Sequence, residues 1–504
     1  MNLINQISYP VIILIILLSI LGYGYILDRI LNLKSKSIDL KNILFIKGLI
    51  FSGTIGMVIN FIFPISSQIS ILIIFLGLII YIYYFIKNKY KKKEYSFIFF
   101  IVLISFIYSF YAGVNDDFDY HIKIINNYKN NNLFSIIHEN RISYNPHWLF
   151  VNSIFSISLL SSSLFAISSI LYSILIYDFY RLYKKSFSNK IAYTGIISFL
   201  ILIFFIGVLN KYKEIGTDIP GVIISFYILL LIINNIFDKK QKISQEDVFT
   251  ILLFSSFIFI IKITNSLIIL FLIITIFHTQ LKKLKLKYIF LPLVLPLLWF
   301  FQNYIISGCL IWPIEFSCFQ NQELAKIETN IIEAFAKGDI NISLSILNSF
   351  NWIKIWLQNH ITKMIETYLL FFLIMTIPIF YSLVNIPKKK TNLWNEVLIN
   401  VKNMNYLFLF SITTLANIIW FLNAPAYRFG IFYNLTLILL ILLPFWKSIF
   451  TINFLFVKKF CSYVLILVVF YFGFENVRKV NWYFDRYESW PPIEKMEFVK
   501  RKKN

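Results

Sequence analysis

Residues 11–27 read VIILIILLSILGYGYIL, a run of seventeen positions without a charged side chain. A helix of about that length can cross the hydrocarbon core of a bilayer. Similar runs recur along a chain that is 58% hydrophobic, with a mean hydropathy of +0.73. The run LTLILLILLPF at 435–445 is apolar on every face, whereas a β-barrel strand alternates apolar and polar residues. The sequence therefore predicts an all-α, polytopic integral membrane protein.

The apolar runs predict about fourteen spans and a fold of 12–14 transmembrane helices. The runs 249–261 and 265–279 are short and interrupted by KITN, so they form either two crossings or one broken helix. We expect N-terminal helices in 1–95, the main transmembrane domain in 96–475 and a basic tail in 476–504. The predicted spans are 7–27, 43–63, 69–86, 96–112, 163–180, 191–209, 219–237, 249–261, 265–279, 289–306, 365–386, 404–422, 430–446 and 461–475.

The net charge of +22 comes from Lys and Arg in short clusters between the apolar runs. That placement orients a membrane protein, so nucleic acid is not expected as a partner. Alternate threading puts KNKYKKK, KKQK, KKLKLK and PKKK on one side, which we expect to be cytoplasmic. The long segments 113–162 and 307–364 then lie outside. The tail 476–504, with eight Lys and Arg, also threads outside, so either a late span is miscounted or the tail forms a small external piece.

Both external segments contain sequences that predict helices lying in the membrane interface. In NWIKIWLQNH, Trp352, Ile353 and Trp356 fall on one helical face. The stretch WLFVNSIFSISLLSSS is predicted to form a similar short helix. Cys309 and Cys318 share the second segment, and two free thiols are favoured over a disulfide. The N-terminus MNLINQISYP lacks the basic region and cleavage site of a removed signal peptide.

The stretch GVNDDFDYHIKI concentrates acid in a basic chain, at Asp116, Asp117 and Asp119. Adjacent carboxylates suit a general base, or a site for Mg²⁺ or Mn²⁺ with Asp218 as a further ligand. Solvated loop residues that cap a helix are the alternative. We expect Asp117 to take a proton, Asp116 to be its neighbour or a metal ligand, and Asp119 to be structural. Helical spacing would place Asp117 one turn from His121.

Cations gather on the same predicted rim. Lys262 interrupts the apolar run FIIKITNSLII, so we expect it near the external edge, facing an anion. Arg428 in NAPAYRFGIF suits a phosphate through its fork of donors, with snorkelling at the interface as the alternative. Asp218 in KEIGTDIPG is either a helix N-cap or an acid facing the same cavity. The other candidates for substrate or phosphate binding are His121, Arg141, His147 and Tyr427.

Four motifs in this order, DDFDYHI, GTDIP, QNYIISGCLIWPIEF and APAYRFG, resemble an uncharacterised family of polytopic bacterial membrane proteins. That family in turn resembles the C superfamily of glycosyltransferases, which includes mannosyltransferases that use polyprenyl-phosphate-linked sugars. The resemblance implies that an acid in the first large external loop, here Asp116 or Asp117, deprotonates the acceptor hydroxyl. The anomeric carbon is then attacked with inversion, and lipid phosphate leaves with help from basic residues, here Arg428 and Lys262, or from a metal.

The chain departs from the well-known members of that superfamily in two ways. Its acidic loop follows the fourth predicted span rather than the first, and it has no large soluble C-terminal domain. The first departure puts the alignment of the catalytic acid in doubt, and the second removes any indication of the acceptor.

The favoured function is therefore a glycosyltransferase in the bacterial inner membrane, acting on its periplasmic or external side in cell-surface glycan synthesis. Its partners would be the bilayer, a polyprenyl-phosphate sugar donor and a glycan, lipid or protein acceptor. A flippase for lipid-linked oligosaccharides is a second hypothesis, although it should carry charges near the midplane and show repeated halves. An O-antigen polymerase or ligase is a third, because the segment 307–364 could be its large external loop.

Overall fold

The computed structural model describes most of the chain, and the described residues are almost entirely helical. The described strands are only β1 (Ile493–Glu494) and β2 (Glu497–Phe498), which pair with each other. The protein is therefore an all-α polytopic membrane protein, as the apolar runs predict. The description covers residues 2–33, 41–88, 93–109, 120–136, 142–157, 161–208, 215–279, 285–338, 344–347, 349–385, 390–486, 493–494 and 497–498.

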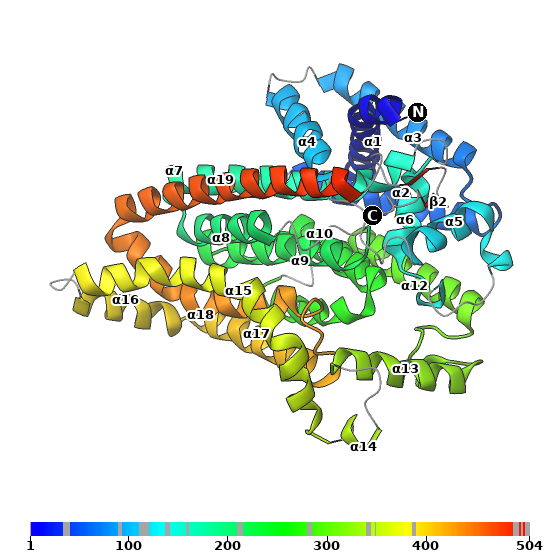
Figure 1. The fold of residues 1–504 in the computed structure, drawn as a ribbon. Coiled ribbons are helices and arrows are strands. Elements are labelled where there is room, and N and C mark those ends of the chain that lie inside the picture. The colour runs from blue at the N-terminus through cyan, green and yellow to red at the C-terminus, as the bar shows by residue number, and fades with distance from the viewer. Residues whose placement is uncertain are drawn as a thin grey trace.

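Ten helices in these ranges are long and apolar enough to cross a membrane, and many of them run side by side in Figure 1. They lie in α1 (Asn2–Ile30), α2 (Lys41–Asn60), α3 (Ser67–Asn88), α7 (Ala166–Ser188), α9 (Asp218–Ile233, continued by the π-turn η6, Asn234–Asp238), α12 (Lys287–Ser307), α15 (Trp352–Asn385), α17 (Met404–Asn423), α18 (Ile431–Ile452) and α19 (Phe454–Arg486). Shorter apolar helices are α4 (Lys93–Ser109), α8 (Ala192–Val208) and α11 (Ile269–Phe277). Every predicted span falls on one of these helices or on α10 (Gln245–Ile261).

Connecting helical elements complete the described chain. They are α5 (Ile122–Asn130), η2 (Leu133–Ser135), η3 (Ile142–Tyr144), α6 (His147–Phe155), η4 (Ser161–Phe165), η7 (Ile263–Ile268), η9 (Glu315–Ser317), α13 (Gln322–Ala336), α14 (Leu344–Leu347) and α16 (Lys390–Val401). Strand β1 contacts η4. Since η4 begins at the end of the predicted external segment 113–162, this strand of the C-terminal tail lies beside the end of that segment.

Helices α10 and α11 form a hairpin, so the interrupted runs 249–261 and 265–279 belong to two helices rather than to one broken helix. Lys262 is extended between them, with φ −161° and ψ 125°, and η7 leads into α11. The amide of Ile243, just before α10, donates to the carbonyl of His278, just after α11, at 3.1 Å. The two outer ends of the hairpin therefore lie together, and Lys262 is at its tip.

Close contacts between backbones hold α1, α2 and α3 together. A Cβ added to Gly48 of α2 would lie 1.9 Å from the carbonyl oxygen of Ile20 in α1. A Cβ added to Gly22 of α1 would lie 2.0 Å from the carbonyl oxygen of Gly77 in α3. Helices in a bilayer gain stability from van der Waals packing, which small residues allow. Glycine is therefore required sterically at these crossings.

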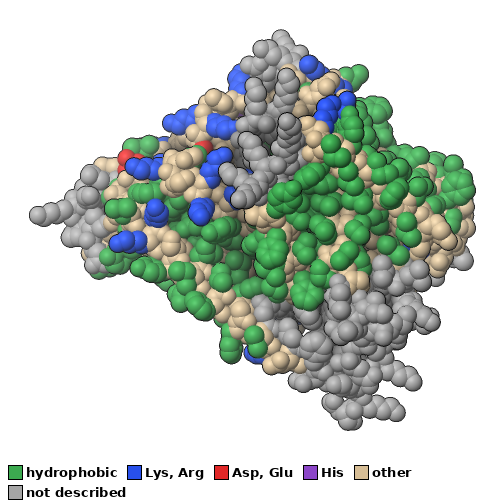
Figure 2. All heavy atoms as spheres, turned by 90° about the horizontal axis from the view of Figure 1, so that it is seen from above, with side chains coloured by type: hydrophobic (Ala, Val, Ile, Leu, Met, Phe, Trp, Pro, Cys, Tyr) green, Lys and Arg blue, Asp and Glu red, His purple; other side chains and the backbone are tan. Residues whose placement is uncertain are grey.

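The bundle places α9 at its centre and α19 at its edge. In the most apolar stretch of α9 and η6 every residue is buried, whereas in the most apolar stretch of α19 only 11% of the residues are buried. Leu467 and Phe470 of α19 are 67% and 73% exposed, as expected for side chains that face lipid. Figure 2 shows a broad hydrophobic face with Lys and Arg gathered toward its margins.

Both stretches predicted to form interfacial helices are helical and pack largely against protein. All nine residues of α6 are buried, because the helix is apolar on nearly every side and packs between neighbouring helices. Trp352 and Trp356 belong to α15, which continues without a break to Asn385, and both pack against Phe421 of α17. The tryptophan face thus packs on protein rather than on lipid headgroups.

The segment 307–364 is held by a disulfide and by a buried lysine. Cys309 and Cys318 form a disulfide, which corrects the preference for two free thiols. The chain folds back between them, since Phe319 N donates to Gly308 O at 2.9 Å.

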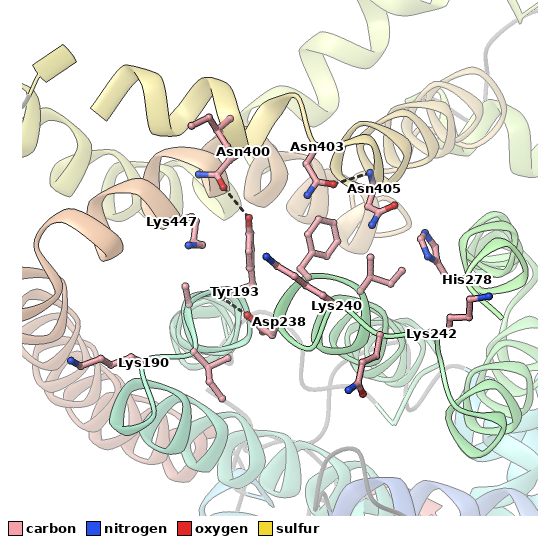
Figure 3. A pocket seen from close by; sticks show the side chains of 16 residues that line it. Lys190, Tyr193, Asp238, Lys240, Lys242, His278, Asn400, Asn403, Asn405 and Lys447 are labelled. Carbon is pink, nitrogen blue, oxygen red and sulfur yellow. Dashed lines mark hydrogen bonds between the residues drawn. The ribbon is translucent and has the colours of Figure 1, made fainter. Parts of the chain in front are cut away.

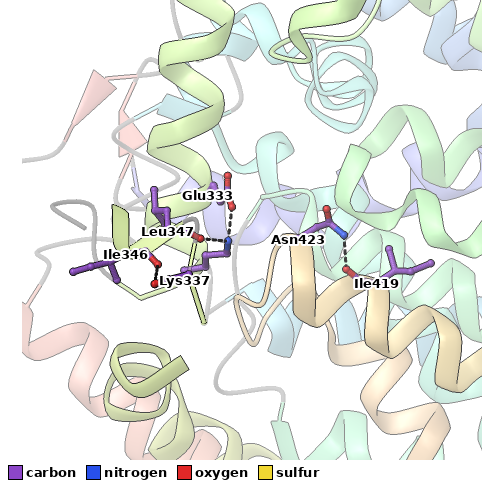
Figure 4. A network of polar contacts seen from close by, with 7 residues as sticks. Glu333, Lys337, Ile346, Leu347, Ile419 and Asn423 are labelled. Atoms are coloured by element: carbon purple, nitrogen blue, oxygen red, sulfur yellow. Dashed lines mark hydrogen bonds and ion pairs between the residues drawn. The ribbon is translucent and has the colours of Figure 1, made fainter. Parts of the chain in front are cut away.

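The buried lysine is Lys337, at the end of α13. It pairs with Glu333, donates to the carbonyl of Leu347 at 3.3 Å and lies 5.0 Å from the ring centre of Trp352 (Figure 4). Lys337 therefore connects α13 to the start of α15.

Candidate functional site

Side chains from three separate elements meet in what we call the ionic cluster, formed by Asp218, Lys262 and Arg428. The ammonium group of Lys262 pairs with Oδ1 of Asp218, and Nε of Arg428 lies 3.5 Å from Oδ2. The three side chains are between 11% and 26% exposed. Two cations thus lie beside one carboxylate in a partly buried position. Cations held close together in such a position are a setting that favours anions.

An aromatic ring lies against both cations. Nζ of Lys262 is 3.9 Å from the ring centre of Phe429, and Cζ of Arg428 is 5.4 Å from it. Cζ of Arg428 also lies 5.9 Å from the ring centre of Phe335 in α13. Cation–π contacts of this kind favour one position of each charge. They also connect the ionic cluster to the segment that carries the disulfide.

Asp218 is positioned by the start of α9. The N-cap is Thr217, so Asp218 is the first helical residue, where a negative charge interacts favourably with the helix dipole. Just before it, the carbonyl of Ile215 accepts a hydrogen bond from Nε1 of Trp148 at 2.9 Å. The N-cap prediction for Asp218 is thus wrong by one residue, and its carboxylate is directed to the two cations.

Buried hydrogen bonds fix the backbone near Lys262 and near Arg428. Beyond the hairpin tip, the carbonyl of Asn265 accepts from the hydroxyl of Tyr433 at 3.1 Å. In the loop before α18, the carbonyl of Pro425 accepts from Nε1 of Trp356 at 2.6 Å. Aromatic donors far away in the sequence therefore fix the backbone that presents the cations.

The other predicted residues are distributed between the cluster and the rest of the fold. His121 is 2% exposed and interacts electrostatically with Asp218. The Tyr427 ring lies 6.2 Å from the imidazole of His360, and Nζ of Lys363 lies 5.8 Å from its centre. Lying outside the described residues are Asp116, Asp117, Asp119 and Arg141.

His147 takes no part in the ionic cluster. Its side chain is fully buried, lies against Phe150 and Phe257, and has no hydrogen-bond partner for either ring nitrogen among the described residues. Burial lowers the pKa of His147 to about 3, so the imidazole is neutral at physiological pH. The described contacts of His147 are thus with aromatic side chains rather than with the ionic cluster.

Of the three predicted metal ligands, the structure describes only Asp218. Within the described ranges, no three His, Cys, Asp or Glu side chains gather as a metal site would require. The oxygens of Asp218 already face Lys262 and Arg428, which would repel a metal ion.

The family model for the domain of unknown function DUF8201 matches residues 7–435. The chain belongs to this family. The ionic cluster and the disulfide lie inside the DUF8201 region, whereas most of α18 and all of α19 follow it. No curated protein and no solved structure matches the chain.

The residues that position the ionic cluster were not predicted from the sequence. Trp148, Trp356 and Tyr433 bind backbone carbonyls of residues 67, 69 and 168 positions away. No local pattern reveals such partners, although a tryptophan or tyrosine beside an apolar run indicates a polar group that must be satisfied when it is buried.

Proposed function

We propose that the protein is a membrane glycosyltransferase that moves a sugar from a polyprenyl-phosphate donor to an acceptor hydroxyl. The observation that carries the proposal is the ionic cluster. It holds the cations Lys262 and Arg428 close together around Asp218. A lipid phosphate that leaves during sugar transfer needs cations of this kind to stabilise it.

The acidic stretch supports the same reading through its place in the sequence. Asp116 and Asp117 stand only four or five positions before His121, which interacts electrostatically with Asp218. In this proposal the acidic stretch supplies the base for the hydroxyl, and the ionic cluster supplies the cations for the phosphate.

The disulfide supports an external location for the cluster. Disulfides persist in oxidising compartments and are rare in the cytosol. Cys309–Cys318 precedes α13, and Phe335 of α13 contacts Arg428. We therefore place the cluster at the periplasmic or external end of an inner-membrane protein.

In the proposed reaction, the acceptor hydroxyl oxygen forms a bond to the anomeric carbon from the face opposite the phosphate. The bond from that carbon to the phosphate oxygen breaks, and the phosphate leaves with the electron pair. The hydroxyl proton passes to Asp117, with Asp116 as its neighbour. Arg428 and Lys262 offset the charge of the leaving phosphate, while Asp218 orients both cations.

Transfer of radiolabelled sugar in proteoliposomes tests the proposal. The protein is reconstituted with a panel of polyprenyl-phosphate sugars and candidate acceptors. Because a positioned base contributes about 10²- to 10⁴-fold, Asp117→Asn is expected to lower the rate at least a hundredfold. Asp119→Asn, an equivalent change two positions away, is the matched control and is expected to keep the rate.

Three outcomes would contradict this assignment. Full transfer by both Asp116→Asn and Asp117→Asn would show that neither carboxylate is the base. Movement of an intact lipid-linked glycan between leaflets without transfer would identify a flippase. Joining of two lipid-linked glycans would identify a polymerase or ligase.

A further inference from the structure

A cavity of about 740 Å³ lies at the opposite ends of the helices from the ionic cluster (Figure 3). Asp238, which lines it, ends the helical run that Asp218 begins, twenty residues or about 30 Å away. His278 and Gln241 line it from the outer ends of the α10–α11 hairpin, whose tip carries Lys262. The cavity is therefore separate from the candidate site.

The lining of this cavity is strongly basic. Lys190, Lys240, Lys242 and Lys447 line it together with a single carboxylate, Asp238, which gives a net charge of +3. In Figure 3, Lys240 and Lys447 lie on either side of Tyr193. Lys190, Lys240 and Lys242 are exposed to solvent, and an anion bound among them would reduce their mutual repulsion.

The carboxylate is already engaged by the protein. Asp238 accepts hydrogen bonds from the backbone amides of Tyr193 at 3.2 Å and Thr194 at 2.8 Å, and from the Thr194 hydroxyl. It thereby satisfies the first amides of α8, which have no partner within the helix. Asp238 also interacts electrostatically with Lys447, as does Glu396 of α16.

The other three lysines have no counter-ion in the part of the protein that the structure describes. Within the described residues, Lys190, Lys240 and Lys242 form no salt bridge.

The N-termini of two helices line the cavity, with amides that already donate to Asp238 in α8 and to Asn403 in α17. Ala192 and Tyr193 line it at the start of α8, and Asn405 lines it at the start of α17. Asn403, which also lines the cavity, accepts from the amide of Asn405 at 2.9 Å. Helix N-termini and lysines together are a recurrent setting for phosphate groups.

We propose that this cavity is a binding site for a phosphate group. The phosphate belongs either to the headgroup of an anionic membrane lipid or to a soluble phosphate compound. The position at the ends of membrane helices suits a headgroup, since basic pockets between transmembrane helices bind anionic lipids. The proposal rests on the cavity alone and is independent of the glycosyltransferase proposal.

Native mass spectrometry with two probes tests the site. The purified full-length protein is titrated with dioleoylphosphatidylglycerol, with dioleoylphosphatidylcholine as the zwitterionic reference, and separately with inorganic phosphate. The variant K240Q/K447Q is expected to bind phosphatidylglycerol about thirtyfold more weakly. K240R/K447R keeps both charges and is expected to bind within about threefold of the wild type. Inorganic phosphate that displaces the lipid would identify a soluble source, and failure to displace it would identify the headgroup.

The matched control is K458Q/K459Q, two exposed lysines of α19 that do not line the cavity. It is expected to bind like the wild type. Equal binding by K240Q/K447Q and by this control would overturn the proposal. If K240Q/K447Q fails to fold, Lys242→Gln at an exposed lining position takes its place, with an expected loss of about fivefold. Unchanged binding by that variant would equally overturn it.

Discussion

The ammonium group of Lys262, at the tip of the α10–α11 hairpin, pairs with the carboxylate of Asp218, 44 positions earlier at the start of α9. Arg428, in the loop before α18, shares the same carboxylate. The acid at the start of α9 therefore connects that helix to the hairpin tip and to this loop. An ion pair of this kind is weak support for stability when intact, but removing one partner leaves an uncompensated charge.

The effects of removing Asp218 and Lys262 on the free energy of unfolding are expected not to be additive. Asp218→Asn leaves two cations together and is expected to lower the free energy of unfolding by about 2 kcal/mol, given the partial exposure of the pair. The double variant D218N/K262Q is expected to lose less than the sum of the two single changes. The measurement is the free energy of unfolding in detergent, followed through the reactivity of the buried thiol of Cys461.

An exposed acid provides the control for this double-mutant cycle. Glu323→Gln on α13 removes an equal charge without a buried partner and is expected to change stability by less than about 0.5 kcal/mol. Strictly additive losses for Asp218 and Lys262 would contradict the pairing.

Two glycines test the packing of the N-terminal helices. Gly48→Ala would force a methyl group against the backbone of Ile20, so α1 and α2 must move apart, at an expected cost of about 2 kcal/mol or more. Gly207→Ala in α8 meets no atom within 4 Å and is expected to be neutral or to stabilise by up to about 1 kcal/mol. Thermal unfolding of both variants is the measurement. Equal midpoints would show that α1 and α2 do not pack so closely.

The fold was largely predictable because the bilayer requires long apolar helices. Every predicted span lies on a helix, and the shared rim expected for Asp218, Lys262 and Arg428 corresponds to a real cluster. Hydrophobic periodicity and the placement of charges predict the spans and the side on which residues lie, because both are local properties of the sequence.

Partners across the fold were not predictable in the same way. The sequence indicated that Lys262 faces an anion, but not that the anion is Asp218. His147 looked like a member of a polar loop, yet it is enclosed by Phe150 and Phe257. The basic clusters near Lys190 and Lys240 were interpreted only as orientation signals, because a cavity forms only after distant helices pack.

The disulfide leads to a prediction about thiol counts and sidedness. Denatured protein that was never reduced is expected to react with maleimide at one thiol per chain, Cys461, and at three after reduction. A C461S variant is expected to show none before reduction. Three reactive thiols without reduction, in protein alkylated directly from cells, would contradict both the disulfide and the external position of the segment.

Lys129 of α5 gives the protein a pH dependence whose sign can be worked out. The side chain is 5% exposed and donates to Ser70 Oγ at 3.2 Å and to the carbonyl of Ile65 at 3.4 Å, with no carboxylate in these contacts. Burial lowers the pKa of Lys129 to about 8 in the folded protein, from 10.5. Above pH 8 the unfolded chain therefore holds more protons than the folded one, so stability rises with pH. Between pH 8 and 9.5 the expected gain is about 2 kcal/mol. Lys129→Met is expected to abolish this gain, whereas Lys123→Met on the exposed face of the same helix is expected to keep it. A wild-type stability that stays level across that range would show that Lys129 remains protonated in its buried position.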